Sequence, residues 1–132
     1  MKVTLLCSDA AHPVNPYLQR WMDGKSDSIE VELVRTKSEA RGGDILFLIS
    51  CSEVLAAEDR RRYAVTLVLH ASDLPHGRGW SPHIWELSRG AESLTLSLLE
   101  ADEKVDAGRI WKKTKVDVPR HALWDEINQL LF

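Results

Sequence analysis

The sequence predicts an open α/β sheet whose central strands are parallel. Two near-continuous apolar runs, "GGDILFLIS" (residues 42–50) and "YAVTLVLH" (residues 63–70), have the length and composition of buried strands. Helix signals and short connections separate the strand-like segments, which is the order found in α/β sheets. The 132 residues suffice for one compact domain and are too few for two. We therefore expect a single domain over residues 1–132.

The remaining segments of the first half fit this class. "KVTLLC" (residues 2–7) is a short apolar run typical of a buried strand, and "SIEVELV" (residues 28–34) alternates like a half-exposed strand near a sheet edge. Between them, Asn15 as N-cap, Pro16 in the first turn and Gly24 at the end predict a helix. The connection over residues 51–63 is long enough for a turn or two of helix.

The second half predicts a helix, two strands and a final helix. Ser81 and Pro82 begin the first helix and Gly90 ends it, while "SLTLSLL" (93–99) and "GRIWKKTKVDV" (108–118) are strand-like. Residues 121–132 form an amphipathic helix, with Leu123, Ile127 and Leu130 expected on its apolar face. No capping signal follows this helix, which leaves a C-terminal truncation of the domain open.

Composition excludes several function classes. Hydrophobic residues make up 44% and charged residues 28%, as in an ordinary globular protein. The net charge of -3 argues against nucleic acid as a partner, since nucleic-acid binding needs a clustered basic surface. Lys112, Lys113 and Lys115 form a basic cluster, and alternating lysines on an edge strand explain it.

Cysteine usage and hydropathy indicate a reducing compartment. Cys7 and Cys51 stand at the ends of apolar runs and are expected to be buried thiols. There is no signal segment and no apolar run approaching about 18 residues, so neither secretion nor membrane insertion is supported. We therefore expect a cytoplasmic protein.

The bend "HASDLPHGRGW" (residues 70–80) is the first candidate functional segment. Ligands of open α/β sheets bind outside the carboxyl ends of the strands, where this bend begins. His70, the last residue of a buried strand, is placed to act as a general base or to polarise a carbonyl. The alternative is that its ring caps nearby backbone groups.

The acidic loop over residues 100–106 is the second candidate. Asp106 is followed by the small residues Ala107 and Gly108, which allow close approach of a backbone or a ligand. Taken alone, this loop is better explained as a solvated acidic turn between two strands.

Together, these segments resemble the formyltransferase family that uses N10-formyltetrahydrofolate. The family signature is a strand ending in Asn-x-His, a Leu-Pro bend, and a loop with a catalytic Asp in "LDxG" or "VDAG". His70, Leu74–Pro75, Gly79 and Asp106 match it, within a resemblance that runs from about Gly43 to Val118. The resemblance implies a Rossmann-like open, mostly parallel twisted sheet with added antiparallel strands.

The stretch "HASDLPHGRGWSPHIW" is most similar to the sugar N-formyltransferase branch. Within that branch it looks most like the enzymes that formylate an amino-sugar nucleotide on the pseudaminic acid route. The resemblance therefore implies a transferase whose formyl donor is N10-formyltetrahydrofolate and whose acceptor is the amine of a nucleotide-linked sugar. It implies no metal, and it leaves a homodimer open.

The resemblance also implies roles for particular residues. His70 would stabilise the developing oxyanion, and Asp106 would orient His70 and pass protons through water. The residues expected to bind folate are Leu48, Ser50, Cys51, Ser52, Asp102, Glu103 and Lys104. The residues expected to face the acceptor substrate are Ser72, Asp73, Arg78, Gly79, Trp80 and Ser81.

One position departs from the family pattern. Val68 stands where the family has Asn, on the same strand face as His70. Loss of one oxyanion donor typically lowers the rate by about 10²–10³, and the nearby candidates to replace it are Ser72, His76 and the indole of Trp80. The alternative is a catalytically impaired or truncated formyltransferase-fold domain that binds folate or a nucleotide.

Two further alternatives are weaker. A folate-dependent deformylase would use the same aspartate with water as the acceptor. A metal hydrolase is suggested by the closeness of His70, Asp73, His76 and His83, but their spacing matches no familiar zinc pattern.

Overall fold

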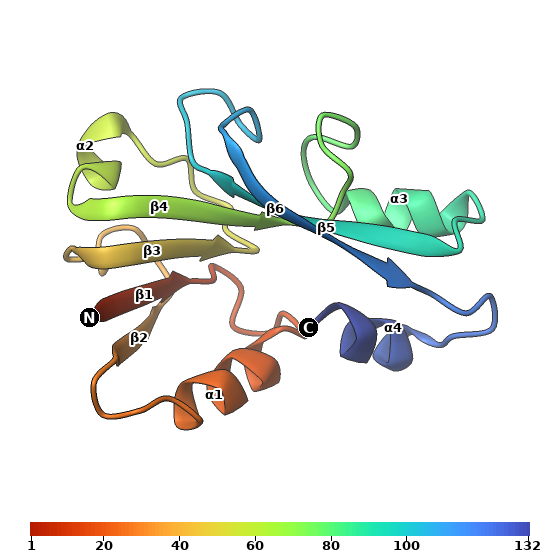
Figure 1. Ribbon diagram of the computed structural model, residues 1–132, viewed down its shortest axis with the longest axis horizontal. Helices are drawn as coiled ribbons and strands as arrows, with labels where there is room; N and C mark the ends of the chain where they lie inside the picture. The colour runs from red at the N-terminus through yellow and green to blue at the C-terminus, as the bar shows by residue number, and fades with distance from the viewer. The chain divides into compact units, whose positions relative to one another are not determined.

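The computed structural model describes residues 1–132, which form a six-stranded sheet in the order β2-β1-β3-β4-β5-β6 (Figure 1). The chain divides into two compact units, Met1–Val68 and Leu69–Phe132. Strand β4 (Tyr63–His70) runs through the boundary between them. The predicted α/β class with a mixed, mostly parallel sheet is confirmed.

The N-terminal unit contains a parallel three-strand core. Its other elements are β1 (Lys2–Leu6), α1 (Asn15–Asp23), β2 (Glu30–Val34), β3 (Gly43–Ile49) and α2 (Ala57–Arg60). Strand β1 pairs in parallel with β2 and with β3, and β2 lies at the sheet edge as its alternation predicts. Thr4, fully buried within β1, donates to Glu32 at 2.8 Å and accepts from the Tyr63 hydroxyl at 3.1 Å. A polar residue is tolerated in this core because both partners are present.

The start of α1 differs from the sequence prediction. Val14, not Asn15, occupies the N-cap position. The Asn15 amide donates instead to the carbonyls of Asp9, Ala10 and His12, and its oxygen accepts from Arg35 at 2.6 Å. The side chain is thus used to close the loop before the helix, and its oxygen, the atom that would cap a helix N–H, accepts from Arg35 instead.

The C-terminal unit is built on an antiparallel hairpin. Its elements after β4 are α3 (Pro82–Ser88), β5 (Ser93–Glu100), β6 (Ile110–Asp117) and α4 (Trp124–Leu131). Strands β5 and β6 pair antiparallel with an irregularity between Leu98 and Leu99, and β6 is the edge strand that its lysines predict. These are the expected added antiparallel strands.

The buried face of α4 differs from the prediction. Leu131 is buried against Leu94 and Val118, with Ile127 packed beside them. Leu123 and Leu130, expected on the same face as Ile127, are 67% and 43% exposed. The helix begins only at Trp124, so Leu123 lies outside it. Over its two turns, the side chains that pack against the core are those of Ile127 and Leu131.

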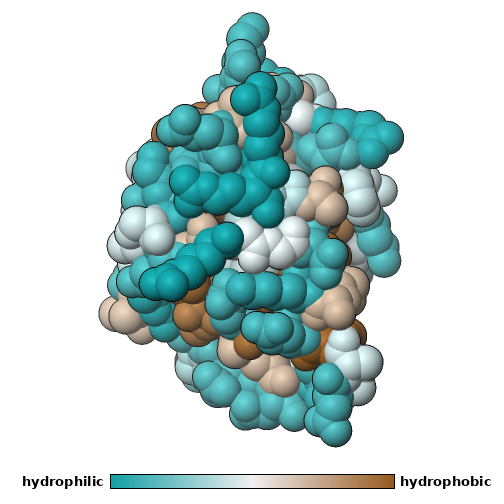
Figure 2. Space-filling view, turned by 90° about the vertical axis from the view of Figure 1, so that its left-hand side faces the viewer, coloured by the Kyte–Doolittle hydropathy of each residue, from teal (hydrophilic) through white to brown (hydrophobic).

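Hydrophilic side chains dominate the visible part of the surface in Figure 2, with hydrophobic ones in small separate areas. None of the helices combines the length and the apolar character that crossing a bilayer requires. Cys7 is buried and Cys51 half-buried, both as free thiols, and burial raises the pKa of each.

Candidate functional site

His70 ends β4 with its ring held between two oxygen atoms. Its Nε2 lies 2.8 Å from the Gly77 carbonyl oxygen, and its Nδ1 lies 3.6 Å from Oδ2 of Asp106. Both side chains are nearly inaccessible, with 9% and 7% of their surfaces exposed. A carbonyl oxygen only accepts hydrogen bonds, so in this arrangement Nε2 carries a proton.

Asp106 reaches the ring from the loop between β5 and β6. Its Oδ2 also accepts the backbone N–H of Gly79 at 3.0 Å, and its own backbone is left-handed, with φ of +53°. Asp106 and the bend over residues 77–79 therefore enclose the imidazole, since Gly77 contacts one ring nitrogen and Gly79 contacts the carboxylate beside the other. Of the family-pattern residues, the structure brings His70, Gly79 and Asp106 together.

Two buried serines shape the bend. The Ser97 hydroxyl, on β5, donates to the Ser72 carbonyl at 2.7 Å, and the Ser72 hydroxyl donates to the His76 carbonyl at 2.8 Å. Both serines are fully buried. Gly77 packs on Ser72 so closely that a Cβ there would lie 2.8 Å from the Ser72 Cβ. The Ser72 hydroxyl, a candidate oxyanion donor from the sequence, is thus already used inside the bend.

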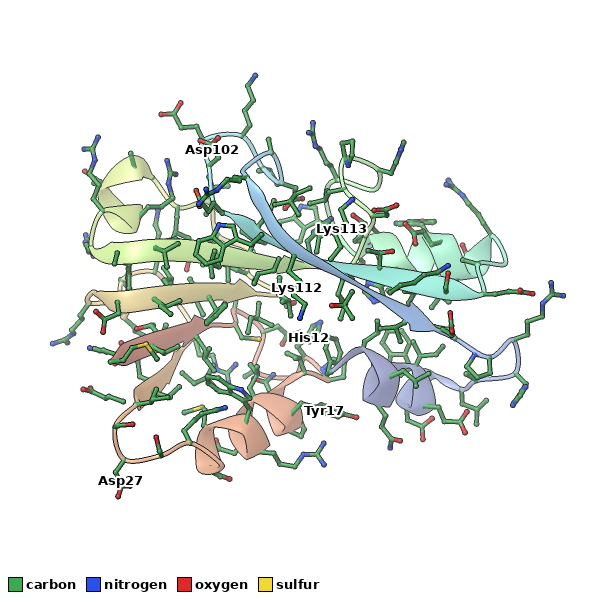
Figure 3. All side chains as sticks on the ribbon, viewed as in Figure 1. His12, Tyr17, Asp27, Asp102, Lys112 and Lys113 are labelled. Carbon is green, nitrogen blue, oxygen red and sulfur yellow. The ribbon has the colours of Figure 1, made fainter.

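Lys113, on β6, makes hydrogen bonds to the bend over residues 70–80. Its Nζ donates to Oδ1 of Asp73 and to the Leu74 carbonyl, both at 2.5 Å (Figure 3 labels Lys113). The hydrogen bond and the positive charge of Lys113 lower the pKa of the Asp73 carboxyl. Asp73, expected to face the acceptor, directs its carboxylate to Lys113.

Hydrogen bonds also hold the base of the acidic loop, where it leaves β5. Oε1 of Glu100 accepts from Arg109 Nη2 at 2.6 Å and from the Trp111 indole at 2.7 Å, and these hydrogen bonds lower the pKa of Glu100. A Cβ on Gly108 would lie 1.9 Å from the Glu100 carbonyl oxygen, so only glycine fits there. The loop that carries Asp106 therefore leaves the hairpin in a restricted direction.

The expected folate residues fall in both units. In the N-terminal unit, Leu48 is buried at the end of β3, Ser50 and Ser52 are exposed, and Ser50 has a left-handed φ of +51°. The Ser52 N–H donates to the Ser8 hydroxyl at 3.0 Å, and Ser8 in turn contacts the thiol of Cys51. The segment after β3 is therefore a hydroxyl-lined turn.

In the C-terminal unit, Asp102, Glu103 and Lys104 are all exposed on the β5–β6 loop (Figure 3 labels Asp102). The next residue, Val105, is 60% exposed, so the loop offers both backbone groups and an apolar side chain to a ligand.

The remaining acceptor-side residues surround the end of the bend. Arg78 and Ser81 are exposed, and Trp80 is 68% exposed. Ser81 stands at the N-cap of α3 in a left-handed conformation, with φ of +49°, and makes no capping hydrogen bond through its side chain. The structure shows no group of three or more His, Cys, Asp or Glu side chains arranged to hold a metal ion.

Sequence reasoning missed the supports of this site. Ser97, Lys113, Glu100 and the carbonyl of Gly77 hold the bend and the loop, and none was singled out for this role. Nothing in the sequence marks Ser97, because the alternating pattern of residues 93–99 places it on the same face as Ser93 and Thr95, which is typical of the polar face of a strand.

The fold and the buried histidine–aspartate pair define the class: the chain has the fold of formyltransferases. Methionyl-tRNA formyltransferase from Clostridium thermocellum superposes with a TM-score of 0.75 at 20% identity, over 90% of this chain and 54% of that one. HypX from Aquifex aeolicus in complex with tetrahydrofolic acid gives 0.69 at 22% identity, over 90% and 22%. A 4-N formyltransferase from Francisella tularensis gives 0.72 at 13% identity, over 98% and 62%.

Among curated proteins, the methionyl-tRNA formyltransferase of Sorangium cellulosum is similar to this chain. It is 29% identical over 107 residues, which cover 75% of this chain and 34% of the relative. The chain thus spans about a third of that relative's length. No protein-family model matches the chain.

Proposed function

We propose that this chain transfers a formyl group from N10-formyltetrahydrofolate to an amine. The observation that carries the proposal is the His70–Asp106 pair, 3.6 Å apart and almost fully buried at the end of β4. A buried imidazole beside a carboxylate is the arrangement that general acid–base catalysis needs. The formyltransferase fold supports this class of chemistry over hydrolysis at a metal.

The donor assignment rests on the residues around this pair. Within the C-terminal unit, the folate would lie against residues 102–104, meeting mainly backbone groups. The exposed loop and the apolar Val105 fit a flat, polar-edged ring system. Support also comes from the similar HypX structure, which was determined with tetrahydrofolic acid.

Formyl-folate supplies an electrophilic formyl carbon to the site. The Nε2–H of His70 exchanges its hydrogen bond to the Gly77 carbonyl for one to the formyl oxygen as negative charge develops there. Asp106 stabilises positive charge on the ring and accepts a proton from the attacking amine, directly or through water. The carbon–N10 bond breaks, and that proton is returned to the leaving folate nitrogen.

The acceptor we propose is the amino group of a nucleotide-linked sugar, such as the 4-amino sugars of the pseudaminic acid route. The similarity to a 4-N formyltransferase supports an amine on a small molecule. Arg78 would pair with a phosphate, and the exposed Trp80 would offer an aromatic face to the substrate. A homodimer and a cytoplasmic location remain part of this proposal.

A direct assay tests the function. The purified chain is incubated with N10-formyltetrahydrofolate and a panel of amino-sugar nucleotides, and formylated product is measured by mass spectrometry. Product that depends on His70 and Asp106 supports the proposal. Formate release without an acceptor would instead identify a deformylase, and no turnover of the donor would contradict both.

Val68 favours a second candidate, a fold-retaining domain that binds folate without efficient turnover. Its side chain is apolar and half-buried two positions before His70, where the family pattern has Asn. Val68→Asn separates the candidates. A gain of about 10²–10³ in rate would mean that the natural chain is impaired by this residue. An unchanged or lower rate would mean that another donor already serves.

A further inference from the structure

We propose that Ser72 and Ser97 are positioning residues that hold the proton of His70 on Nε2. They act through the Gly77 carbonyl, and neither is assigned this role by the proposed function. The inference rests on formyl transfer only in stating how that proton is used. The effect of the two serines on the His70 tautomer does not depend on whether the chain catalyses formyl transfer.

Two acceptors compete for the single proton of a neutral His70 ring. Asp106 faces Nδ1, and a charge-assisted hydrogen bond to a carboxylate is ordinarily the stronger one. Here, however, Asp106 is 3.6 Å away, beyond normal hydrogen-bond distance, while the Gly77 carbonyl is 2.8 Å from Nε2. Distance therefore decides in favour of the Nε2–H tautomer.

The position of the Gly77 carbonyl depends on the two serines. Ser97 fixes the Ser72 carbonyl from β5, and Ser72 fixes the preceding carbonyl of the bend, that of His76. Gly77 then packs directly on the Ser72 side chain, with φ of +71°. Both hydroxyls are fully buried, so water cannot readily replace either one.

The tautomer matters for the chemistry. With the proton on Nε2, the N–H that donates to the Gly77 carbonyl can pass to the formyl oxygen when the donor binds, and Nδ1 can take up a proton beside the Asp106 carboxylate. With the proton on Nδ1, the Nε2 lone pair would repel the developing negative charge. The serine pair thus keeps His70 a donor at the position where a donor is needed.

The ring nitrogens can be observed directly by ¹⁵N NMR, with His70 assigned by its loss in His70→Gln. At a pH where the ring is neutral, we expect wild type to show the Nε2–H tautomer. Ser72→Ala and Ser97→Ala should shift the population toward Nδ1–H, because Asp106 then competes better. Ser97→Thr retains a hydroxyl and should restore the wild-type pattern.

Thr66→Val is the matched control. Thr66 is a buried β4 residue whose hydroxyl has no hydrogen-bond partner, so its removal should leave the His70 spectrum unchanged. If Ser72→Ala does not fold, the spectra of Ser97→Ala and of wild type still show whether the serines control the His70 tautomer. A wild-type ring in the Nδ1–H form, or alanine variants with the wild-type pattern, would overturn the proposal.

Kinetics give an independent readout. The doubly protonated ring has no tautomers and donates from both nitrogens, and Asp106 is the charged side chain that contacts it. The ratio of wild-type to Ser72→Ala kcat should therefore shrink as pH falls, with KM little changed. If NMR shows the expected shift but no transfer is detected, the positioning role stands and the proposed function fails.

Discussion

Steric limits at single residues set the geometry around Asp106. Gly77 and Gly108 stand at the two approaches to it, one in the bend and one at the base of the acidic loop. At both positions an added Cβ would come closer than 3 Å to a neighbouring atom, and at Gly108 that atom is a backbone oxygen 1.9 Å away. The backbone cannot yield there without moving the hairpin.

Gly108→Ala should therefore destabilise the chain by about 1–3 kcal/mol, as overpacking does elsewhere. Urea denaturation monitored by circular dichroism measures it. Gly24→Ala is the control, because a Cβ there meets its nearest atom at an ordinary 3.5 Å. Equal losses in the two variants would contradict the steric argument.

Charge on Asp106 should matter more than its shape. Asp106→Asn keeps an oxygen to accept the Gly79 N–H but cannot stabilise a positive ring or take up a proton. We expect the formyl-transfer rate to fall by about 10²–10⁴ with folding preserved, measured by steady-state assay beside Asp117→Asn, an exposed change on β6. Wild-type turnover in Asp106→Asn would remove this residue from the mechanism.

At the scale of elements, the bend after β4 depends on the edge strand β6. Lys113 joins them through Asp73 and the Leu74 carbonyl. The lysines of β6 thus differ in role, although the sequence presents them as one basic cluster. One of them, Lys113, links the bend over residues 70–80 to the sheet.

This contact predicts a specific pH dependence of stability. The pKa of Asp73 is lowered in the folded chain, mainly by the Lys113 hydrogen bond. The ionised carboxylate therefore adds to the free energy of unfolding at pH values above the unfolded pKa. This stabilisation is lost as the pH falls below about 4. Asp73→Asn should be less stable than wild type at pH 7, with the gap closing in acid. Thermal melts from pH 7 to pH 2 measure this.

The comparison for that series is Asp27→Asn, an exposed aspartate in the turn before β2 (labelled in Figure 3). Its melting curve should follow wild type at every pH. A gap between Asp73→Asn and wild type that stays constant down to pH 2 would mean that charge pairing with Lys113 contributes nothing.

At the scale of the whole molecule, ligand binding should stabilise the folded chain. A ligand at a hundred times its Kd adds about 2.7 kcal/mol to the free energy of unfolding. We expect 5-formyltetrahydrofolate, a stable analogue of the donor, to raise Tm and to give a saturable calorimetric titration. An alanine substitution at Lys104 should weaken both, and an unchanged Tm at millimolar analogue would argue against folate as the donor.

Much of the fold could be predicted because it depends on local patterns. The apolar runs of β1, β3 and β4, the alternation of β2 and the lysines of β6 each marked a strand, and edge or central position followed from polarity. The errors lie where one residue had several potential partners. The Asn15 oxygen accepts from Arg35 instead of capping α1. In the last helix, Leu131 packs in the core whereas Leu123 and Leu130 are exposed.

By itself, the sequence determined the class of sheet, the order of its elements and the two segments that carry His70 and Asp106. These follow from residue type and spacing along the chain. The tertiary structure alone decided that Gly77 and Asp106 face opposite ring nitrogens, that Ser97 and Ser72 support this arrangement, and that Lys113 fastens the bend. Such contacts join residues 7 to 40 positions apart, and their distances depend on packing that no local pattern encodes.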